Sequence, residues 1–364
     1  MQAETYRIEN EGEILSPALI YYADRIRENT RRTIEIAGGA ERLWPHVKSH
    51  KMRAMLEMQM EMGVRRFKCA TLAEAEMAAE AGAAHVLLAY PLVGPAIAAF
   101  VSLVQKYPAV QFYALADDRG ALCALDRKPR SKTPRSAFCR CQHGHEPHRR
   151  GNRAAVRFHP RHRPAAGAAL QRPALLRRHV HTADLLEREA EVAEMVAAIA
   201  DALDRLEAVG TEIPAIIAGG SPSFPCHAAN PTFSLAGHGV FVDAGYSAAY
   251  PDLPFTPAAA VLTRVVSHPA DGIFTLDLGC KGIASDPAGP RGVVAGLEHA
   301  EALFQSEEHW TYRMLPGHEA ERPAIGAAFY VIPTHICPTT ALYSAALVAE
   351  NGRITGRWTV DARR

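Results

Sequence analysis

Short apolar runs that end in turn residues alternate with helical patterns through the first third of the sequence. The apolar runs occupy residues 42–48, 65–70, 85–90 and 111–117. An extended run at 17–22 and a helical pattern at 23–39 precede them. A parallel strand reaches its neighbour only through a long crossover, which is usually a helix. The alternation therefore predicts a parallel α/β sheet or barrel.

The helical pattern at residues 71–83 shows how regular this alternation is. Thr71 is placed to cap the start of the helix, Glu74 follows three residues later, and alanines recur at helical spacing. The pattern continues further along the chain with a long amphipathic helix and two strands, at 184–210, 215–223 and 239–245.

After Pro251 the pattern changes to β-runs and turns without long helices, at 259–268, 272–279, 324–333 and 353–360. We therefore predict an α/β fold class, in which a (β/α)8 TIM-type barrel over residues 1–248 is followed by a C-terminal β-rich domain over residues 249–364.

The overall charge excludes several classes of partner. The 364 residues carry a net charge of +1, so no overall field attracts nucleic acid or an anionic membrane. The seven cysteines are irregularly spaced, and the chain begins with a polar stretch, which argues against secretion. No apolar stretch reaches the length of a membrane span. We expect a cytoplasmic protein that binds neither nucleic acid nor membranes.

Residues 127–178 interrupt the pattern. This segment holds thirteen arginines and one glutamate, and it has neither strand nor helix periodicity. Its composition is compatible with a disordered basic insert, an RNA-binding arm or a metal loop. The RNA-binding arm is disfavoured because the segment has almost no aromatic side chains to stack bases. The metal loop would use Cys139, Cys141, His143, His145 and His148.

Lys48 ends the apolar run 42–48, with His46 and His50 on either side. A lysine at the carboxyl end of a barrel strand faces the mouth where such folds do chemistry, and desolvation there favours the neutral amine that forms a Schiff base. The alternative is a solvated lysine at a strand end. Two glycine-rich stretches, 218–223 and 235–239, could hold a phosphate through backbone N–H groups, although such turns are common.

His335 and Cys337 form a third motif, in the stretch THICPTT. In an extended segment their side chains project to the same face, and imidazole with thiolate suits zinc. Two protein ligands leave positions open for water and substrate, as a catalytic metal site requires. The alternative is a buried cysteine beside a surface histidine.

Several stretches together resemble the D-threonine aldolase and D-serine dehydratase family of fold-type III pyridoxal-phosphate enzymes. They are PHVKSHK, FKCATLAEAEMAAEAGA, LLAYPLVGP, AGGSPSFP, VFVDAGY, LTRVVSHP, LDLG, QSEEH and THICPTTALY. The resemblance implies an alanine-racemase-like barrel in which Lys48 carries pyridoxal 5'-phosphate. It also implies that Gly220, Ser221, Gly237 and His238 lie against the phosphate and that His335 and Cys337 hold a divalent metal (zinc, manganese or magnesium).

The family expects two further strands in the middle of the barrel, one ending like VDVxxGMxRTG and one like GLHxYDGH. The chain as written contains neither. Both arise if the codons are read one base later, because 139–149 can then encode VDVNTGMNRTG and 172–178 can encode GLHSYDG, which runs into His179. We therefore interpret residues 127–178 as out of frame or disordered.

The resemblance implies a metal-assisted lyase that acts on D-3-hydroxy amino acids, with D-threonine-aldolase-type cleavage to glycine and an aldehyde as the leading reaction. His179 aligns with a family histidine and is the candidate acid/base. The alternatives are D-serine dehydratase activity and a catalytically defective relative. The expected partners are a small D-amino acid substrate and a second copy in a homodimer.

Overall fold

The computed structural model describes residues 3–116, 136–139, 176–177, 180–208, 216–237 and 240–363. Contacts divide the chain into two compact units made of interleaved segments. The β unit contains Met1–Arg32, Ser49–Met55 and Gly239–Arg363, and the barrel unit contains Thr33–Lys48 and Leu56–His238. The domain boundary at residue 248 stays a prediction. None of the helices in the described part of the chain combines the length and apolar character that a membrane span needs.

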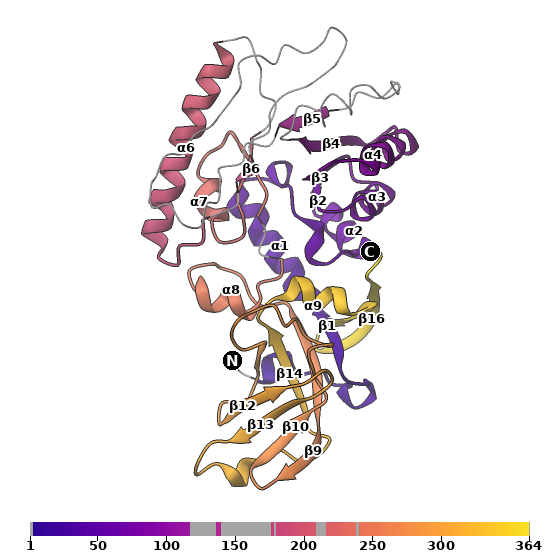
Figure 1. Ribbon diagram of the computed structural model, residues 1–364, viewed down its shortest axis with the longest axis vertical. Coiled ribbons are helices and arrows are strands. Elements are labelled where there is room, and N and C mark those ends of the chain that lie inside the picture. The colour runs from indigo at the N-terminus through magenta and orange to yellow at the C-terminus, as the bar shows by residue number, and fades with distance from the viewer. Residues whose placement is uncertain are drawn as a thin grey trace. The chain divides into compact units, whose positions relative to one another are not determined.

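The barrel unit contains two parallel sheets that one short segment connects (Figure 1). Leu43 bridges Leu235 of one sheet and His46 bridges Lys68 of the other, both in parallel. The two sheets contain β2 (Arg66–Cys69), β3 (His85–Pro91), β4 (Gln111–Ala116) and β5 (Ser136–Cys139), and β6 (Leu176–Arg177), β7 (Ile216–Ala218) and β8 (Phe233–Leu235).

The spatial order of the strands is therefore β6, β7, β8, the segment 43–46, β2, β3, β4 and β5. Seven parallel strands and the bridging segment 43–46 give the eight strand positions of a (β/α)8 barrel. No pairing recorded for the described residues joins β5 to β6. These two strands lie in the segment 127–178, most of which is outside the described residues.

Helices connect β2 to β3, β3 to β4, β6 to β7 and β7 to β8. In Figure 1, α2, α3 and α4 lie side by side along β2, β3 and β4. The cap predicted for 71–83 is present: Glu74 N donates to Thr71 Oγ1 at 3.1 Å, and Ala70 N donates to Glu74 Oε2 at 2.6 Å. The helices are α1 (Ala23–Ala37), which spans both units, α2 (Arg53–Glu61), α3 (Leu72–Glu80), α4 (Pro95–Lys106), α6 (Leu185–Glu207) and α7 (Phe224–Ala228).

One buried cluster draws its residues from several barrel strands and so fills the barrel interior. Its members are Trp44, Leu87, Leu115, Ile217 and Ala236. Residues in direct register on neighbouring strands point to the same face of a sheet. Lys68 pairs with Leu87 in this way, so the Lys68 side chain also faces the interior, where the residue is only 4% exposed.

The β unit is built on a nine-stranded sheet in the order β12, β13, β10, β9, β1, β15 and β16, with β14 on β9 and β11 on β14. The run 17–22 forms β1 of this sheet and pairs with β9 and β15. The elements are β1 (Ala18–Tyr22), β9 (Ala259–Ala270), β10 (Ile273–Leu276), β11 (Gly292–Val294), β12 (Ala300–Gln305), β13 (Trp310–Met314), β14 (Ala328–Pro333), β15 (Ala345–Glu350), β16 (Arg353–Thr359), α8 (Ala244–Ala249) and α9 (Ile336–Leu342).

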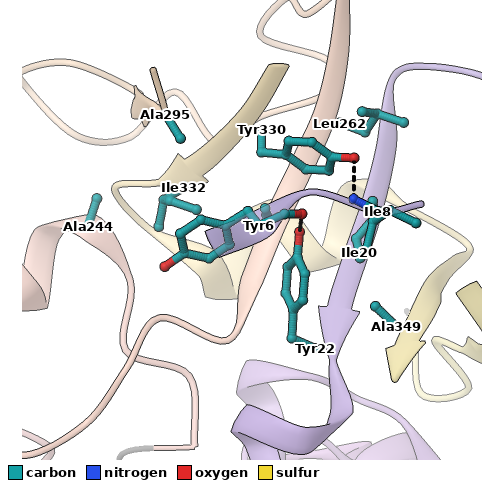
Figure 2. Packing of buried hydrophobic residues seen from close by; sticks show 11 residues of the cluster. Tyr6, Ile8, Ile20, Tyr22, Ala244, Leu262, Ala295, Tyr330, Ile332 and Ala349 are labelled. Carbon is teal, nitrogen blue, oxygen red and sulfur yellow. Dashed lines mark hydrogen bonds between the residues drawn. The ribbon is translucent and has the colours of Figure 1, made fainter. Parts of the chain in front are cut away.

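Tyrosine hydroxyls fasten the start of the chain to this sheet (Figure 2). Tyr22 donates to the carbonyl of Tyr6 at 2.6 Å, and Tyr330 accepts from the backbone N–H of Ile8 at 3.0 Å. The aromatic rings supply apolar area while their hydroxyls satisfy backbone groups that burial would otherwise leave unpaired. The N-terminal residues therefore pack with the C-terminal half of the sequence.

Two sequence predictions about local structure need correction. The described part of the run 239–245, residues 240–245, does not form a strand, because Asp243 caps α8 through a hydrogen bond from Tyr246 N at 2.9 Å. The run 42–48 forms only isolated bridges before a 3-10 turn, Val47–Ser49. A cap residue that accepts from the second or third following amide favours helix over continued extension.

The Glu-Glu-His stretch shared with the family, residues 307–309, packs against the turn that contains Gly279 and Lys281. A Cβ on Gly279 would lie 2.0 Å from the carbonyl oxygen of Glu307, so only glycine allows this close approach of two backbones. Lys281 N donates to the same oxygen at 3.0 Å, and Lys281 Nζ lies 2.6 Å from the Glu307 carboxylate. The stretch thus anchors one turn of the β unit to another.

Candidate functional site

Lys48 lies at the carboxyl end of the segment that joins the two parallel sheets. Trp44 N donates to Leu235 O at 2.8 Å, and Lys68 N donates to Pro45 O at 2.9 Å, so this segment lies between β8 and β2. Lys48 follows in the 3-10 turn, where its backbone N–H donates to His46 Nδ1 at 3.3 Å and its side chain is partly buried. This is the strand-end position that the sequence predicts.

The two glycine-rich stretches follow β7 and β8, the next strands in the same order. Ala236 N donates to Ala218 O at 2.9 Å and aligns the two strand ends. A Cβ on Gly237 would lie 2.8 Å from the carbonyl carbon and oxygen of Gly220, and Gly219 has φ +109°, so both positions need glycine. The carboxyl ends of three neighbouring strands therefore bring Lys48, Gly220, Ser221 and Gly237 to one edge of the barrel unit.

This arrangement fits pyridoxal phosphate. The cofactor needs an amine for its aldehyde and backbone N–H groups for its phosphate, and closely packed glycine turns leave N–H groups accessible to an anion. His238, the remaining predicted phosphate residue, lies outside the described residues, as do His179 and the Cys/His positions 141, 143, 145 and 148. Cys139 is the last residue of β5, but its side chain is not described.

Sequence reasoning missed Lys68 as a candidate functional residue. Lys68 lies on β2, the strand next to the segment that contains Lys48. Its backbone forms a parallel β-bridge with the backbone of His46. A buried lysine that faces a barrel interior places a cationic or basic group there. The signal was present in the run 65–70, since Lys68 stands between the apolar residues Phe67 and Cys69 near the end of the strand.

His335 and Cys337 lie in the β unit, at the start of α9. His335 is the extended residue that precedes the helix, with φ −139° and ψ 102°, whereas Cys337 lies in the first helical turn. The predicted extended conformation is therefore wrong for Cys337. The two side chains nevertheless interact, because the imidazole of His335 and the thiol of Cys337 form a hydrogen bond.

Asp286 orients the imidazole of His335. The Asp286 Oδ2 atom lies 2.5 Å from His335 Nδ1, which leaves Nε2 for another ligand. The hydrogen bond to Cys337 raises the pKa of His335 to about 9; burial acts in the opposite direction, and Asp286 adds to the increase. A carboxylate bonded to the distal nitrogen of an imidazole is the usual support of a metal-binding histidine. The donor set thus fits a divalent metal.

Asp243 fixes the backbone between the two predicted metal ligands. It accepts from Tyr246 N at 2.9 Å and from Ile336 N at 3.1 Å. Burial raises the pKa of this carboxyl to about 6, and the two backbone hydrogen bonds oppose the increase. Sequence reasoning missed both supporting carboxylates, because Asp243 and Asp286 lie far from His335 in the sequence.

Comparisons with known proteins match both halves of the chain. Residues 22–243 match the family described as alanine racemase, N-terminal domain, and residues 258–349 match the putative serine dehydratase domain. D-threonine aldolase of an Arthrobacter species is 31% identical over 184 residues, which are 49% of this chain and 47% of that protein. The chain thus aligns with about half the length of this relative. The 3-hydroxy-D-aspartate aldolase of Paracoccus denitrificans is 23% identical over 97% of this chain and 93% of that protein.

Solved structures share the fold. D-threonine aldolase from Filomicrobium marinum has a TM-score of 0.81 at 24% identity, covering 97% of each chain. D-threo-3-hydroxyaspartate dehydratase from Delftia sp. HT23 has a TM-score of 0.74 at 20% identity, covering 95% of this chain and 97% of that one. The predicted α/β fold class, a barrel with a C-terminal β-rich domain, is confirmed. Because its N-terminal domain match spans more than half of the sequence, the chain belongs to the alanine-racemase-like, fold-type III family of pyridoxal-phosphate proteins.

Proposed function

We propose that the protein is a pyridoxal-phosphate-dependent lyase that cleaves D-3-hydroxy amino acids to glycine and an aldehyde. The observation that carries the proposal is the convergence of Lys48, Gly220, Ser221 and Gly237 at the carboxyl ends of three neighbouring strands. The similarity to a D-threonine aldolase and a 3-hydroxy-D-aspartate aldolase supports this reaction class.

Each candidate functional residue of the barrel unit has a defined role in this proposal. Lys48 binds the cofactor through its amine, and the N–H groups of the turns after β7 and β8 bind the phosphate. When bound, the cofactor supplies the electron sink that stabilises negative charge at the substrate's α-carbon. The buried ammonium of Lys68 would add positive charge on the adjacent strand.

In the β unit, His335 and Cys337 would hold a divalent metal, with Asp286 fixing the ring of His335. Such an ion supplies Lewis acidity toward a hydroxyl oxygen. Solved structures of D-threo-3-hydroxyaspartate dehydratase include a histidine-to-alanine variant and a metal-free cysteine-to-alanine variant, at positions two apart. This His-x-Cys spacing supports the same assignment here. Among zinc, manganese and magnesium, a thiolate ligand favours zinc.

Two elements of the proposal come from the sequence alone. The acid/base role of His179 stays a prediction, and so does the homodimer. The frame of residues 127–178 decides between an active lyase and a catalytically defective relative.

A second candidate reaction is β-elimination of water, which would give a keto acid and ammonia. The match of residues 258–349 to the putative serine dehydratase domain favours it. Both reactions share the cofactor, so the products must discriminate between them.

The test is an absorption spectrum, with added pyridoxal phosphate, of the chain whose reading frame is restored over residues 127–178. Product analysis with D-threonine, D-serine and D-3-hydroxyaspartate follows. We expect a borohydride-reducible adduct and release of glycine with an aldehyde. Release of ammonia and a keto acid without glycine would select the dehydratase reaction. A protein that binds the cofactor but produces neither set of products would be the defective relative, whereas a folded protein without any adduct would overturn the proposal.

A further inference from the structure

A group of two imidazoles and one carboxylate stands on the β unit, on elements other than those of His335 and Cys337. It consists of His299, His318 and Glu321, whose potential ligand atoms all lie within 4.8 Å of one another. His299 Nδ1 lies 2.8 Å from Glu321 Oε2, and His318 Nδ1 lies 2.8 Å from Glu321 Oε1. Two histidines and a glutamate are a ligand set that proteins use for zinc.

The backbone holds these three residues in place. His299 directly precedes β12, and its carbonyl accepts from Leu315 N at 2.8 Å, at the end of β13. His318 N donates to Leu315 O at 3.0 Å, and Glu321 N donates to His318 O at 2.9 Å, so one compact turn presents both residues. Gly317, with φ +86°, permits the bend before this turn. The ligands are therefore positioned by hydrogen bonds that do not involve their side chains.

The side chains also have the exposure and spacing that a metal site needs. Their side chains are 51%, 34% and 55% exposed for His299, His318 and Glu321, so an ion and its remaining water ligands can enter. The two imidazole rings lie 3.8 Å apart between centroids, so both are close enough to share one ion with the carboxylate.

The distances suit a tetrahedral ion. Zinc binds imidazole nitrogen and carboxylate oxygen at about 2.1 Å, so its ligand atoms lie roughly 3.3 Å from one another. The two 2.8 Å contacts with Glu321 would open slightly to admit the ion, and exposed side chains can make this adjustment without repacking the sheet.

We propose that His299, His318 and Glu321 form a second divalent transition-metal site, which ties the β12–β13 hairpin to the turn that follows it. The site does not depend on the proposed enzymatic function. It would take an ion such as zinc with water in the remaining positions, and its role would be to stabilise this edge of the β unit.

The test is zinc stoichiometry by equilibrium dialysis of the full-length chain, repeated on the chain with a restored reading frame because all three ligands lie outside residues 127–178. Glu321→Gln and His318→Gln should each bind one zinc ion fewer than the unmodified chain. We expect the affinity of this site to fall by at least about 100-fold, more than the roughly 10- to 100-fold that loss of an outer hydrogen-bond partner causes. His318→Cys keeps a zinc ligand and should restore the missing ion.

His309→Gln is the matched control, because His309 is an exposed histidine of the same sheet edge outside the cluster. A His335→Ala and Cys337→Ala double variant should lose a different zinc ion and keep this one. Circular dichroism melts should show that zinc raises the melting temperature of the double variant but not of the same double variant that also carries Glu321→Gln. The proposal is overturned if Glu321→Gln and His318→Gln bind as much zinc as the unmodified chain, or if His309→Gln loses as much as they do.

Discussion

The barrel unit and the β unit hold their candidate functional residues in different ways. In the barrel unit the residues come from the ends of three strands, and the positions of Lys48 and Gly237 depend on the order of the whole strand set. In the β unit His335 and Cys337 are two residues apart at one helix start, and Asp286 supports them from a neighbouring turn. Damage to the strand order should therefore abolish the first site and leave the second intact.

The largest effect should come from the reading frame of residues 127–178. Eight strands close a barrel only if each strand carries an apolar face. The arginine-rich sequence of residues 127–178 has no alternating apolar pattern that would provide such a face. Losing that burial costs more than the roughly 5–15 kcal/mol by which domains are stable. We expect the chain as written to aggregate or to lack cofactor binding, and the frame-restored chain to be soluble, yellow and active.

Resequencing the gene, thermal melts and absorption spectra of both chains check this prediction. If the metal site of the β unit does not depend on the barrel strands, chelator-sensitive metal binding at His335 and Cys337 should be similar in the two chains. A cooperative melt, bound cofactor and an equal turnover rate for the chain as written would show that the basic segment is a tolerated insert.

Lys48→Ala tests the barrel unit alone. Within the part of the chain that the structure describes, no other lysine occupies the strand-end position, so we expect complete loss of the borohydride-reducible adduct, measured by absorbance and by mass after reduction. Lys281→Ala, an exposed lysine of the β unit, is the control and should retain the adduct. An adduct that persists in Lys48→Ala would refute the assignment.

Cys337→Ala and treatment with a strong chelator test the β unit alone. Both should remove lyase activity and leave the cofactor absorbance unchanged, because the metal and the cofactor are held by different residues. Activity assays and spectra on the same samples separate the two effects. Full turnover in a strong chelator would rule out a metal role for His335 and Cys337.

Asp286→Asn should have a smaller effect than removing a ligand. The amide can still contact His335 Nδ1 but carries no charge, so we expect metal affinity to fall by about 10- to 100-fold while the ligands remain. Competition with a chromophoric chelator measures this change. Asp252→Asn, on an exposed turn of the same unit, should leave the affinity unaltered.

The sequence predicted the features that depend on local spacing. The cap of α3, the strand end at Lys48 and the glycine turns after β7 and β8 all follow from residue types at short, fixed separations. The alternation of strand and helix patterns predicted the fold class, and the family resemblance implied the same fold. The identities of the metal-site neighbours could not be predicted in this way, because Asp286 and His335 are 49 residues apart and meet only through the sheet.

The same limit explains the other omissions. The run 17–22 has strand character, but only its pairing with β9 and β15 shows that it belongs to the β unit. The cluster of His299 and Glu321 escaped because its members are separated by a hairpin. The conformation of Cys337 was mispredicted because the cap provided by Asp243, nearly a hundred residues earlier, starts a helix where the local sequence also permits an extended strand.

The smallest expected effect concerns the amino-terminal ends of the barrel strands. Residues at this face of a barrel contribute to stability, whereas residues at the opposite face carry the chemistry. His85 begins β3, and its Nδ1 lies 2.9 Å from the Tyr113 hydroxyl. Burial lowers the pKa of His85, and the nearby charge of Arg66 lowers it further. The unfolded chain therefore binds a proton here more readily than the folded chain, so this contribution to stability is present above the usual histidine pKa and is lost as the pH falls below it.

His85→Gln keeps a hydrogen-bonding group for Tyr113 but cannot titrate. We expect the loss of unfolding free energy between pH 7 and pH 5 to be smaller in this variant, by less than about 1 kcal/mol because the half-buried ring is screened by solvent. Denaturant unfolding at several pH values measures this difference, and equal pH slopes for the two proteins would contradict it.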